Sequence, residues 1–237
     1  MSTRVTISPT EAAERPYVIC HMSPSIDGKI VAKHWPSLKI AYAAYERTAA
    51  TFDADAWIVG RVSMAPYAGK SRVRRLTRKQ RMPRRDFIAE AKAQSYAIAI
   101  DPSGKLTWRS NAIDDAHVIT VLAEGVSDDY LAFLQSRGVS YVFGGRARID
   151  LKRVLTKLRT AFGIRRLLLE GGGKINGSFL AAGLIDELSI LIAPVADGSI
   201  GTPTLFDAIA AKGLARKLRL ISISRIKGDL VWLRYKM

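Results

Sequence analysis

The sequence is poor in cysteine and histidine, and both scarcities limit its chemistry. It has one cysteine, Cys20, so no intramolecular disulfide can form and the chain suits a reducing compartment such as the cytoplasm. Its three histidines, His21, His34 and His117, stand far apart without the spacing of metal ligands. We therefore expect neither a metal site nor a disulfide scaffold.

Long apolar runs are missing as well. Residues 1–14 lack the apolar centre of a secretory signal, and no apolar run is long enough to span a bilayer. The sequence has no Gly-x-Ser-x-Gly elbow, which argues against an α/β-hydrolase. We expect a soluble, cytoplasmic protein without a membrane partner.

Acidic residues are outnumbered, 21 against 37 basic ones, which gives a formal net charge of +16. Nine of the basic residues and no acidic ones fall within residues 70–85. This basic stretch could bind nucleic acid, form a solvated loop, or close as an arm over a phosphorylated substrate. It lacks interleaved aromatic residues for base stacking and matches no known DNA-binding motif. Nucleic acid is therefore the least favoured of the three.

The 237 residues, 48% of them hydrophobic, suffice for one large domain with a real core. A polar lead-in, poorly ordered, is expected over 1–15, followed by one domain over 16–237. Strands are predicted at 17–22, 29–32, 56–60, 95–100, 117–122, 139–143, 167–169, 187–194, 218–223 and 230–235. Helices are predicted at 39–52, from 61, and at 86–93, 127–136, 150–162 and 175–182.

Strands and helices alternate through the middle of the chain, and only strands follow at the end. This order is typical of an α/β fold with a mostly parallel central sheet, helices on both faces, and antiparallel C-terminal strands.

The segment 165–183 organises the rest of the chain. A short apolar strand ends at Glu170, three glycines follow (Gly171–Gly173), and a helix begins at once. Such a turn offers free backbone N–H groups to a phosphate, and glycine lets a ligand approach the backbone closely. The pattern is neither G-x-G-x-x-G, because of Asn176, nor a P-loop. A structural turn without a ligand is the alternative.

A second strand ends in a glycine turn of the same kind, Gly60-Arg61-Val62-Ser63. Ligands of open α/β sheets bind outside the carboxyl ends of the strands, so two such turns would suit a dinucleotide. Arg61 could bind a phosphate bidentately and Ser63 could donate its hydroxyl. Alternatively, Arg61 is a surface arginine at a helix start, and Ser63 is an ordinary helix-start residue.

Several motifs occur together in one order: Pro16-Tyr17-Val18, Ser25-Ile-Asp-Gly-Lys29, the Val-Gly turn at 59–60, Glu-Gly-Gly at 170–172, and Phe179 to Leu188 with Ala193-Pro194. In this combination the chain resembles the C-terminal reductase domain of the riboflavin-biosynthesis deaminase/reductase, which has a dihydrofolate-reductase-like fold. The resemblance covers about residues 16–236. It implies a stand-alone reductase without the deaminase domain, and a homodimer formed through the C-terminal strands.

The resemblance also implies NADPH as cofactor. In that family the backbone at the Ser23 position meets the nicotinamide, and the Ser63 position and the run matching Gly172–Ser178 hold phosphates and ribose. Arg61 looks like the arginine of dihydrofolate reductases that recognises the 2′-phosphate. The expected cofactor-binding residues are Ser23, Gly60, Arg61, Ser63, Gly171, Gly172, Gly173, Lys174, Ile175 and Asn176.

The resemblance implies 5-amino-6-(5-phosphoribosylamino)uracil as substrate, a phosphorylated small molecule. Bifunctional members often carry lysine where this chain has His21, and paired aspartates near Tyr67. These departures leave open an NADPH-dependent reductase of a dihydropterin, a dihydrofolate or another small molecule. A basic nucleic-acid-binding protein is the alternative from another class.

Hydride transfer needs polar groups that supply a proton and orient the substrate, and His21, Asp27 and Glu170 are the catalytic candidates. In that family the glutamate matching Glu170 faces the substrate. Each residue has a structural alternative. His21 could be a core histidine, Asp27 could make the turn before Gly28, and Glu170 could cap the glycine turn.

Overall fold

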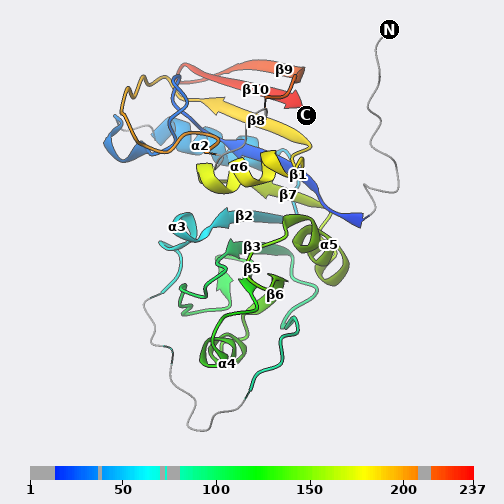
Figure 1. Ribbon diagram of the computed structural model, residues 1–237. Coiled ribbons are helices and arrows are strands. Elements are labelled where there is room, and N and C mark those ends of the chain that lie inside the picture. Colours follow the sequence, from blue (N-terminus) through cyan, green and yellow to red (C-terminus); the bar gives the residue numbers. More distant parts are fainter. Residues whose placement is uncertain (1–13, 37–38, 70–72, 74–80, 208–214) are drawn as a thin grey trace.

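The computed structural model describes residues 14–36, 39–69, 73, 81–207 and 215–237. Within these residues ten strands form one sheet in the order β4-β5-β3-β2-β7-β1-β8-β10-β9, and β6 pairs with β5 as well. The sheet runs through the molecule from β9 at the top of Figure 1 to β6 near α4. The strands are β1 (Tyr17–Met22), β2 (Ala56–Gly60), β3 (Ser95–Ile100), β4 (Ala112–Ile113), β5 (Ala116–Ala123), β6 (Ser140–Gly145), β7 (Arg166–Leu169), β8 (Glu187–Ile192), β9 (Arg219–Ile226) and β10 (Leu230–Lys236).

Helices cover both faces of the sheet, as predicted. One face packs against α5 and α6, in front of the sheet in Figure 1, through a core that includes Ile58, Leu158 and Phe179. The opposite face packs against α2 and α4 through separate clusters. The helices are the 3₁₀ turn η1 (Ala32–His34), α2 (Lys39–Ala50), α3 (Arg61–Met64), α4 (Asp128–Ser136), α5 (Leu151–Phe162) and α6 (Gly173–Ala181).

The strand directions confirm the predicted α/β class. β1 runs parallel to β7 and β8, and β2, β3, β5 and β6 continue the parallel part. The last strand, β10, is antiparallel to both β8 and β9. Parallel strands expose their carboxyl ends along one edge, so the turns after β1, β2 and β7 lie at the same edge of the sheet.

Local signals in the sequence place the helix ends correctly. Ser127 caps α4 by accepting a hydrogen bond from Tyr130 N, and Asp150 caps α5 by accepting one from Arg153 N. Gly163 ends α5 in the left-handed conformation, with φ of +69°.

Two predicted elements are wrong. Residues 29–32 form no strand: Ile30 N bonds Pro203 O and Leu205 N bonds Gly28 O, so this backbone pairs with an irregular segment. Residues 86–93 form no helix, because Phe87 exchanges two backbone hydrogen bonds with Tyr141 of β6. In both cases tertiary partners take the backbone groups that regular structure would have used.

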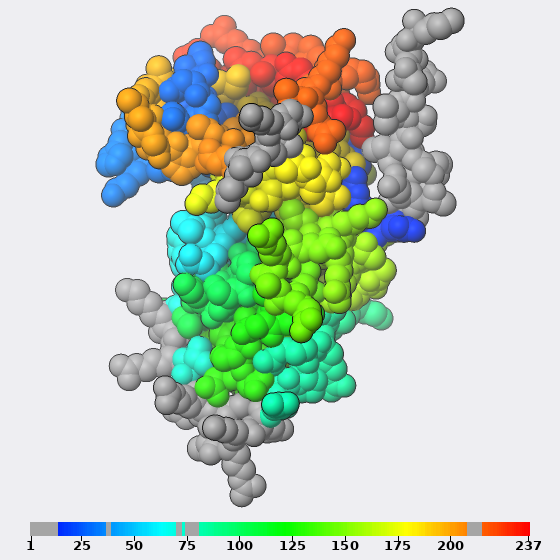
Figure 2. All heavy atoms as spheres, in the orientation of Figure 1, coloured from blue at the N-terminus to red at the C-terminus, as the bar shows by residue number. Residues whose placement is uncertain are grey.

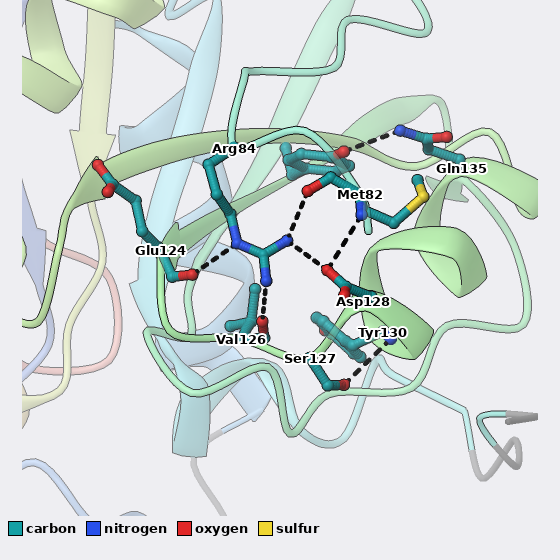
Figure 3. A network of polar contacts seen from close by, with 9 residues as sticks. Met82, Arg84, Glu124, Val126, Ser127, Asp128, Tyr130 and Gln135 are labelled. Atoms are coloured by element: carbon teal, nitrogen blue, oxygen red, sulfur yellow. Dashed lines mark hydrogen bonds and ion pairs between the residues drawn. The ribbon is translucent and has the colours of Figure 1, made fainter. Parts of the chain in front are cut away.

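Arg84 belongs to the basic stretch and serves the fold (Figure 3). Its guanidinium donates to the carbonyl oxygens of Glu124, Val126 and Met82 at 2.8 to 3.0 Å. It also pairs with Asp128 at 2.7 Å, and this hydrogen bond holds the pKa of that carboxyl below its usual range. Arg84 therefore fastens the chain before β3 to the start of α4.

Of the basic stretch, the structure describes Val73 and residues 81–85. The other residues of the stretch lie outside the described residues, as do residues 1–13 of the lead-in. Within the described part of the chain, no helix is long and apolar enough to cross a membrane. The same part holds no group of three or more histidine, cysteine or acidic side chains that could bind a metal ion.

The contact between α6 and β2 depends on a glycine. An added Cβ at Gly60 would lie 2.8 Å from Cγ1 of Ile175, the third residue of α6. Ordinary carbon contacts are about 3.5 to 4 Å, so a methyl group here would push the helix away from the strand.

We expect Gly60→Ala to lower the free energy of unfolding by about 1 to 3 kcal/mol, the usual cost of overpacking a core. Urea unfolding followed by tryptophan fluorescence measures this. Gly125→Ala is the matched control, because nothing lies within 4 Å of its added Cβ. Equal unfolding midpoints for the two variants would contradict the proposed packing constraint.

Candidate functional site

The two glycine turns predicted as a pair do meet. Gly60 N donates to Gly171 O at 3.0 Å, which joins the end of β2 to the end of β7. A Cβ built on Gly172 would be 3.7 Å from the Ser63 hydroxyl oxygen. In Figure 2 the yellow atoms of α6 lie against the cyan atoms of the segment that begins with α3. The two turns therefore lie side by side at one edge of the sheet.

The backbone of the second turn has the form that an anion needs. Gly171 has φ of +96°, and an added Cβ would lie 2.9 Å from Cε of Met22, so only glycine fits. The Gly171–Gly172 peptide bond is cis. Gly172 caps α6 without any side-chain hydrogen bond, which leaves the first N–H groups of this nine-residue helix available. Such a backbone cradle can bind an anion such as a phosphate.

Two predicted cofactor residues face the interior instead. Gly173 O accepts from Asp207 N at 2.9 Å, and an added Cβ would collide with Thr204 O. Asn176 is fully buried, and its Nδ2 donates to Leu205 O at 3.0 Å, whereas its Oδ1 has no hydrogen-bond partner among the described residues. These two residues hold the segment 204–207 against α6, which is a structural role that the sequence did not reveal.

The other predicted cofactor residues differ in exposure. Ile175 fills the space left by Gly60, and Lys174 is exposed beside it. Arg61, the first residue of α3, keeps 43% of its side chain exposed and forms a long ion pair with Asp101. Arg61 and Lys174 therefore bring positive charge to the edge where the cradle lies.

Ser23 follows β1 directly and lines a pocket of about 300 Å³. Its hydroxyl donates to Leu191 O at 2.9 Å, so its side chain is fixed against β8. Tyr42 and Tyr45 of α2 and Trp35 form the aromatic part of the pocket. The pocket is completed by Ala32, Pro36, Ala41 and Ala193.

Glu170 lines a second, larger pocket of about 610 Å³, which shares Tyr42 with the first. Burial raises the pKa of the Glu170 carboxyl to about 7; the neighbouring Tyr45 side chain opposes this rise and the nearby Glu46 adds to it. A carboxyl group with this pKa can donate or accept a proton near neutral pH. Of the three catalytic candidates, Glu170 alone lines either of these two pockets among the described residues.

His21 is fully buried between the sheet and α2. Its Nδ1 contacts the Ser189 hydroxyl at 2.9 Å, its Nε2 contacts Tyr45 O at 3.2 Å, and its ring stacks on that of Tyr45. Burial lowers the pKa of His21 to about 4, so the ring is neutral at physiological pH. This geometry favours the structural alternative, in which His21 supports Tyr45 rather than touching a substrate.

Asp27 ties two loops together. Its carboxylate accepts hydrogen bonds from the Ser25 hydroxyl and from the backbone N–H groups of Asp197 and Gly198, at 2.7 to 3.0 Å. These bonds hold the pKa of Asp27 far below its usual range, the Ser25 bond contributing most. This geometry favours the structural alternative, in which Asp27 shapes the loop after β1.

Sequence reasoning missed Tyr45. Its hydroxyl donates to His21 O at 3.0 Å and lies near the Glu170 carboxyl, so Tyr45 stands between the Ser23 pocket and Glu170. Burial raises the pKa of Tyr45 well above its usual value, which keeps the hydroxyl protonated. The one signal in the sequence that could have identified Tyr45 is its position on the buried side of a predicted helix.

The model of the RibD C-terminal domain family matches residues 16–232. A 2,5-diamino-6-ribosylamino-4(3H)-pyrimidinone 5′-phosphate reductase from Methanothermobacter thermautotrophicus is 36% identical over 107 residues, 45% of this chain and 49% of that protein. The match therefore spans about half of that relative's length. A reductase of the same name from Archaeoglobus fulgidus is 26% identical over 90% of this chain and 94% of its own.

Solved structures share the fold. A pyrimidine reductase-like protein from Corynebacterium diphtheriae superposes with a TM-score of 0.68 at 18% identity, covering 96% of this chain and 94% of its own. RibD of Acinetobacter baumannii gives 0.64 at 20% identity, covering 94% of this chain and 58% of its own. The predicted dihydrofolate-reductase-like sheet is confirmed.

The curated relatives are named as reductases, which is the predicted enzyme class, an oxidoreductase. With its family model matched from strand β1 to strand β10, the chain belongs to the RibD C-terminal domain family.

Proposed function

We propose that this chain is an NADPH-dependent reductase of a 6-ribosylaminopyrimidine 5′-phosphate in riboflavin biosynthesis. The observation that carries the proposal is the junction of the β2 and β7 turns, flanked by the Ser23 pocket and the Glu170 carboxyl. Hydride would pass from the nicotinamide to C1 of the sugar, ring-opened to an imine, and the imine nitrogen would gain a proton. The product is a ribitylamino compound.

Two forms of the pyrimidine are candidate substrates. The sequence resemblance favours 5-amino-6-(5-phosphoribosylamino)uracil. The names of the archaeal relatives favour the 2,5-diaminopyrimidinone, which carries an amino group at C2. Both are phosphorylated and present the same C1, so one mechanism serves either. A dihydropterin or dihydrofolate remains the substrate to test if neither is reduced.

NADPH, when bound, would supply the hydride. Gly171, Gly172 and Ser63 would hold its phosphates, Arg61 would bind the 2′-phosphate, and the Ser23 backbone would meet the nicotinamide. The residues fit this group because the glycine cradle, the uncapped helix start and two cations share one sheet edge.

Glu170 and Tyr45 are the groups that we assign to proton supply. Glu170 has a pKa near 7 and faces the larger pocket, and the Tyr45 hydroxyl reaches it from the smaller one. A protonated Glu170 would deliver a proton to the imine nitrogen, and the tyrosine would keep the carboxyl oriented.

Titration with NADPH and NADH, followed by tryptophan quenching, tests the cofactor. We expect micromolar NADPH binding and weaker NADH binding. Arg61→Ala should weaken NADPH binding by about tenfold to a hundredfold, since a charged hydrogen bond is worth about 1.5 to 3 kcal/mol, and should leave NADH binding unchanged. Lys152→Ala, at the start of α5, is the control for a lost charge. Failure of both cofactors to bind would refute the proposal.

The pH profile of kcat/KM tests Glu170. Because its pKa is raised to about 7, the proton-donating form is lost as pH rises through that value, and activity should fall above it. Glu170→Gln should abolish this limb of the profile and slow turnover by about a hundredfold or more, the usual loss with a general acid. NADPH affinity should stay unchanged. Normal turnover in the variant would remove Glu170 from the mechanism.

The proposed enzyme acts as a homodimer joined at the edge strand β9. Within the described residues β9 pairs with β10 alone, and Leu220, Ile221 and Ile223 are exposed on it by 41 to 64%. Apolar side chains on an open strand edge are aggregation-prone unless covered, and a second copy would cover them symmetrically.

Light scattering tests the dimer. We expect twice the chain mass of 26.0 kDa for the parent protein and a monomer for Ile223→Lys, because a charge cannot be buried unpaired in an apolar interface. Ile88→Lys changes a 42% exposed isoleucine elsewhere and should leave the dimer intact. A parent protein that is monomeric at all concentrations would reject this assembly.

A further inference from the structure

A buried carboxylate lies beside Arg61. Asp101 directly follows β3 and is fully buried. Its Oδ2 accepts hydrogen bonds from the backbone N–H groups of Lys105 and Leu106, at 2.6 and 2.7 Å. Its Oδ1 has no hydrogen-bond partner among the described residues, and the neighbouring Tyr130 hydroxyl donates to Leu106 O.

The unbonded oxygen is the one that meets Arg61. Oδ1 of Asp101 lies 4.0 Å from Nε of Arg61, and this ion pair is its charge partner among the described residues. A buried carboxylate oxygen without a hydrogen bond is costly, so a nearby cation offsets part of that cost. Figure 1 places α3, which Arg61 begins, at the end of β2 and beside β3.

One side of the guanidinium therefore faces protein and the rest is open. With Nε 4.0 Å from Asp101 and 43% of the side chain exposed, part of the guanidinium remains accessible to a second anion. An arginine side chain loses about 2 kcal/mol of rotamer entropy when it is fixed. If the free protein already fixes the Arg61 side chain, ligand binding does not cost this rotamer entropy again.

We propose that Asp101 is a positioning residue that holds Arg61 ready for the 2′-phosphate, and so sets the preference for NADPH over NADH. This inference rests on the proposed function, since it assumes that NADPH binds at this edge. Asp101 itself is fully buried, and its carboxylate oxygens meet backbone N–H groups and Arg61. It acts only through Arg61.

Asp101→Asn separates this role from a structural one. The amide oxygen can still accept from Lys105 and Leu106, whereas the charge next to Arg61 is lost. We expect the NADPH dissociation constant to rise about five- to tenfold, the effect of a partly buried ion pair, and the NADH constant to change less than about twofold. Adenosine 2′,5′-bisphosphate should weaken like NADPH, and AMP should not.

Asp55→Asn is the matched control. Asp55 Oδ2 accepts from two backbone N–H groups, Arg165 N and Arg166 N, at 2.7 and 2.8 Å, but it precedes β2 and so lies at the opposite edge of the sheet. This variant should bind both cofactors as the parent does. If Asp101→Asn does not fold, Asp101→Ser keeps one acceptor oxygen for the turn and removes the same charge.

A double-mutant cycle completes the test. In an Arg61→Ala background, Asp101→Asn should change NADPH affinity no further, because a residue that acts through Arg61 has no effect without it. Unchanged discrimination in Asp101→Asn, tighter NADPH binding, or an equal loss of both cofactors would overturn the inference while the proposed function stands. A parent that binds neither cofactor overturns both.

Discussion

The close approach of α6 to β2 is the contact on which the site depends. Gly60 has no side chain, and Ile175 fills the space that a side chain would occupy. The approach lets Gly60 N reach Gly171 O and brings Ser63 next to Gly172. A larger residue at 60 would separate the two turns, so the same glycine serves packing and, in the proposed enzyme, phosphate binding.

Burial decides the protonation of the site. His21 is buried beside Ser189, whose hydroxyl accepts a hydrogen bond from the Trp232 indole at 2.8 Å and also contacts the imidazole. Because burial lowers the pKa of His21, the histidine stays neutral. The same desolvation acts in the opposite direction on a carboxyl group and raises the pKa of Glu170 to about 7. One physical effect thus lowers the pKa of the histidine and raises that of the glutamate.

The local sequence determined most of the elements and their order. The ends of helices α4 and α5 were predicted to within about one residue from the period of apolar residues, the caps Ser127 and Asp150, and Gly163. Such signals act within one or two turns of the chain. Alternation of strands and helices gave the parallel sheet. The two glycine turns and their shared edge also followed from the sequence, since parallel strands end on one side.

Tertiary structure decided the roles of single side chains. The sequence could not tell that Asn176 and Gly173 hold the segment 204–207, that His21 is buried against α2, or that residues 86–93 lie along β6. These outcomes depend on partners distant along the chain, whose positions no local pattern encodes. The sequence by itself determined that two glycine turns end neighbouring strands at one edge of the sheet, where the structure joins them. Only the tertiary structure decided which polar groups lie at that edge of the sheet. Tyr45 and Asp101 could be identified only from the structure, because burial and contact are properties of the assembled core.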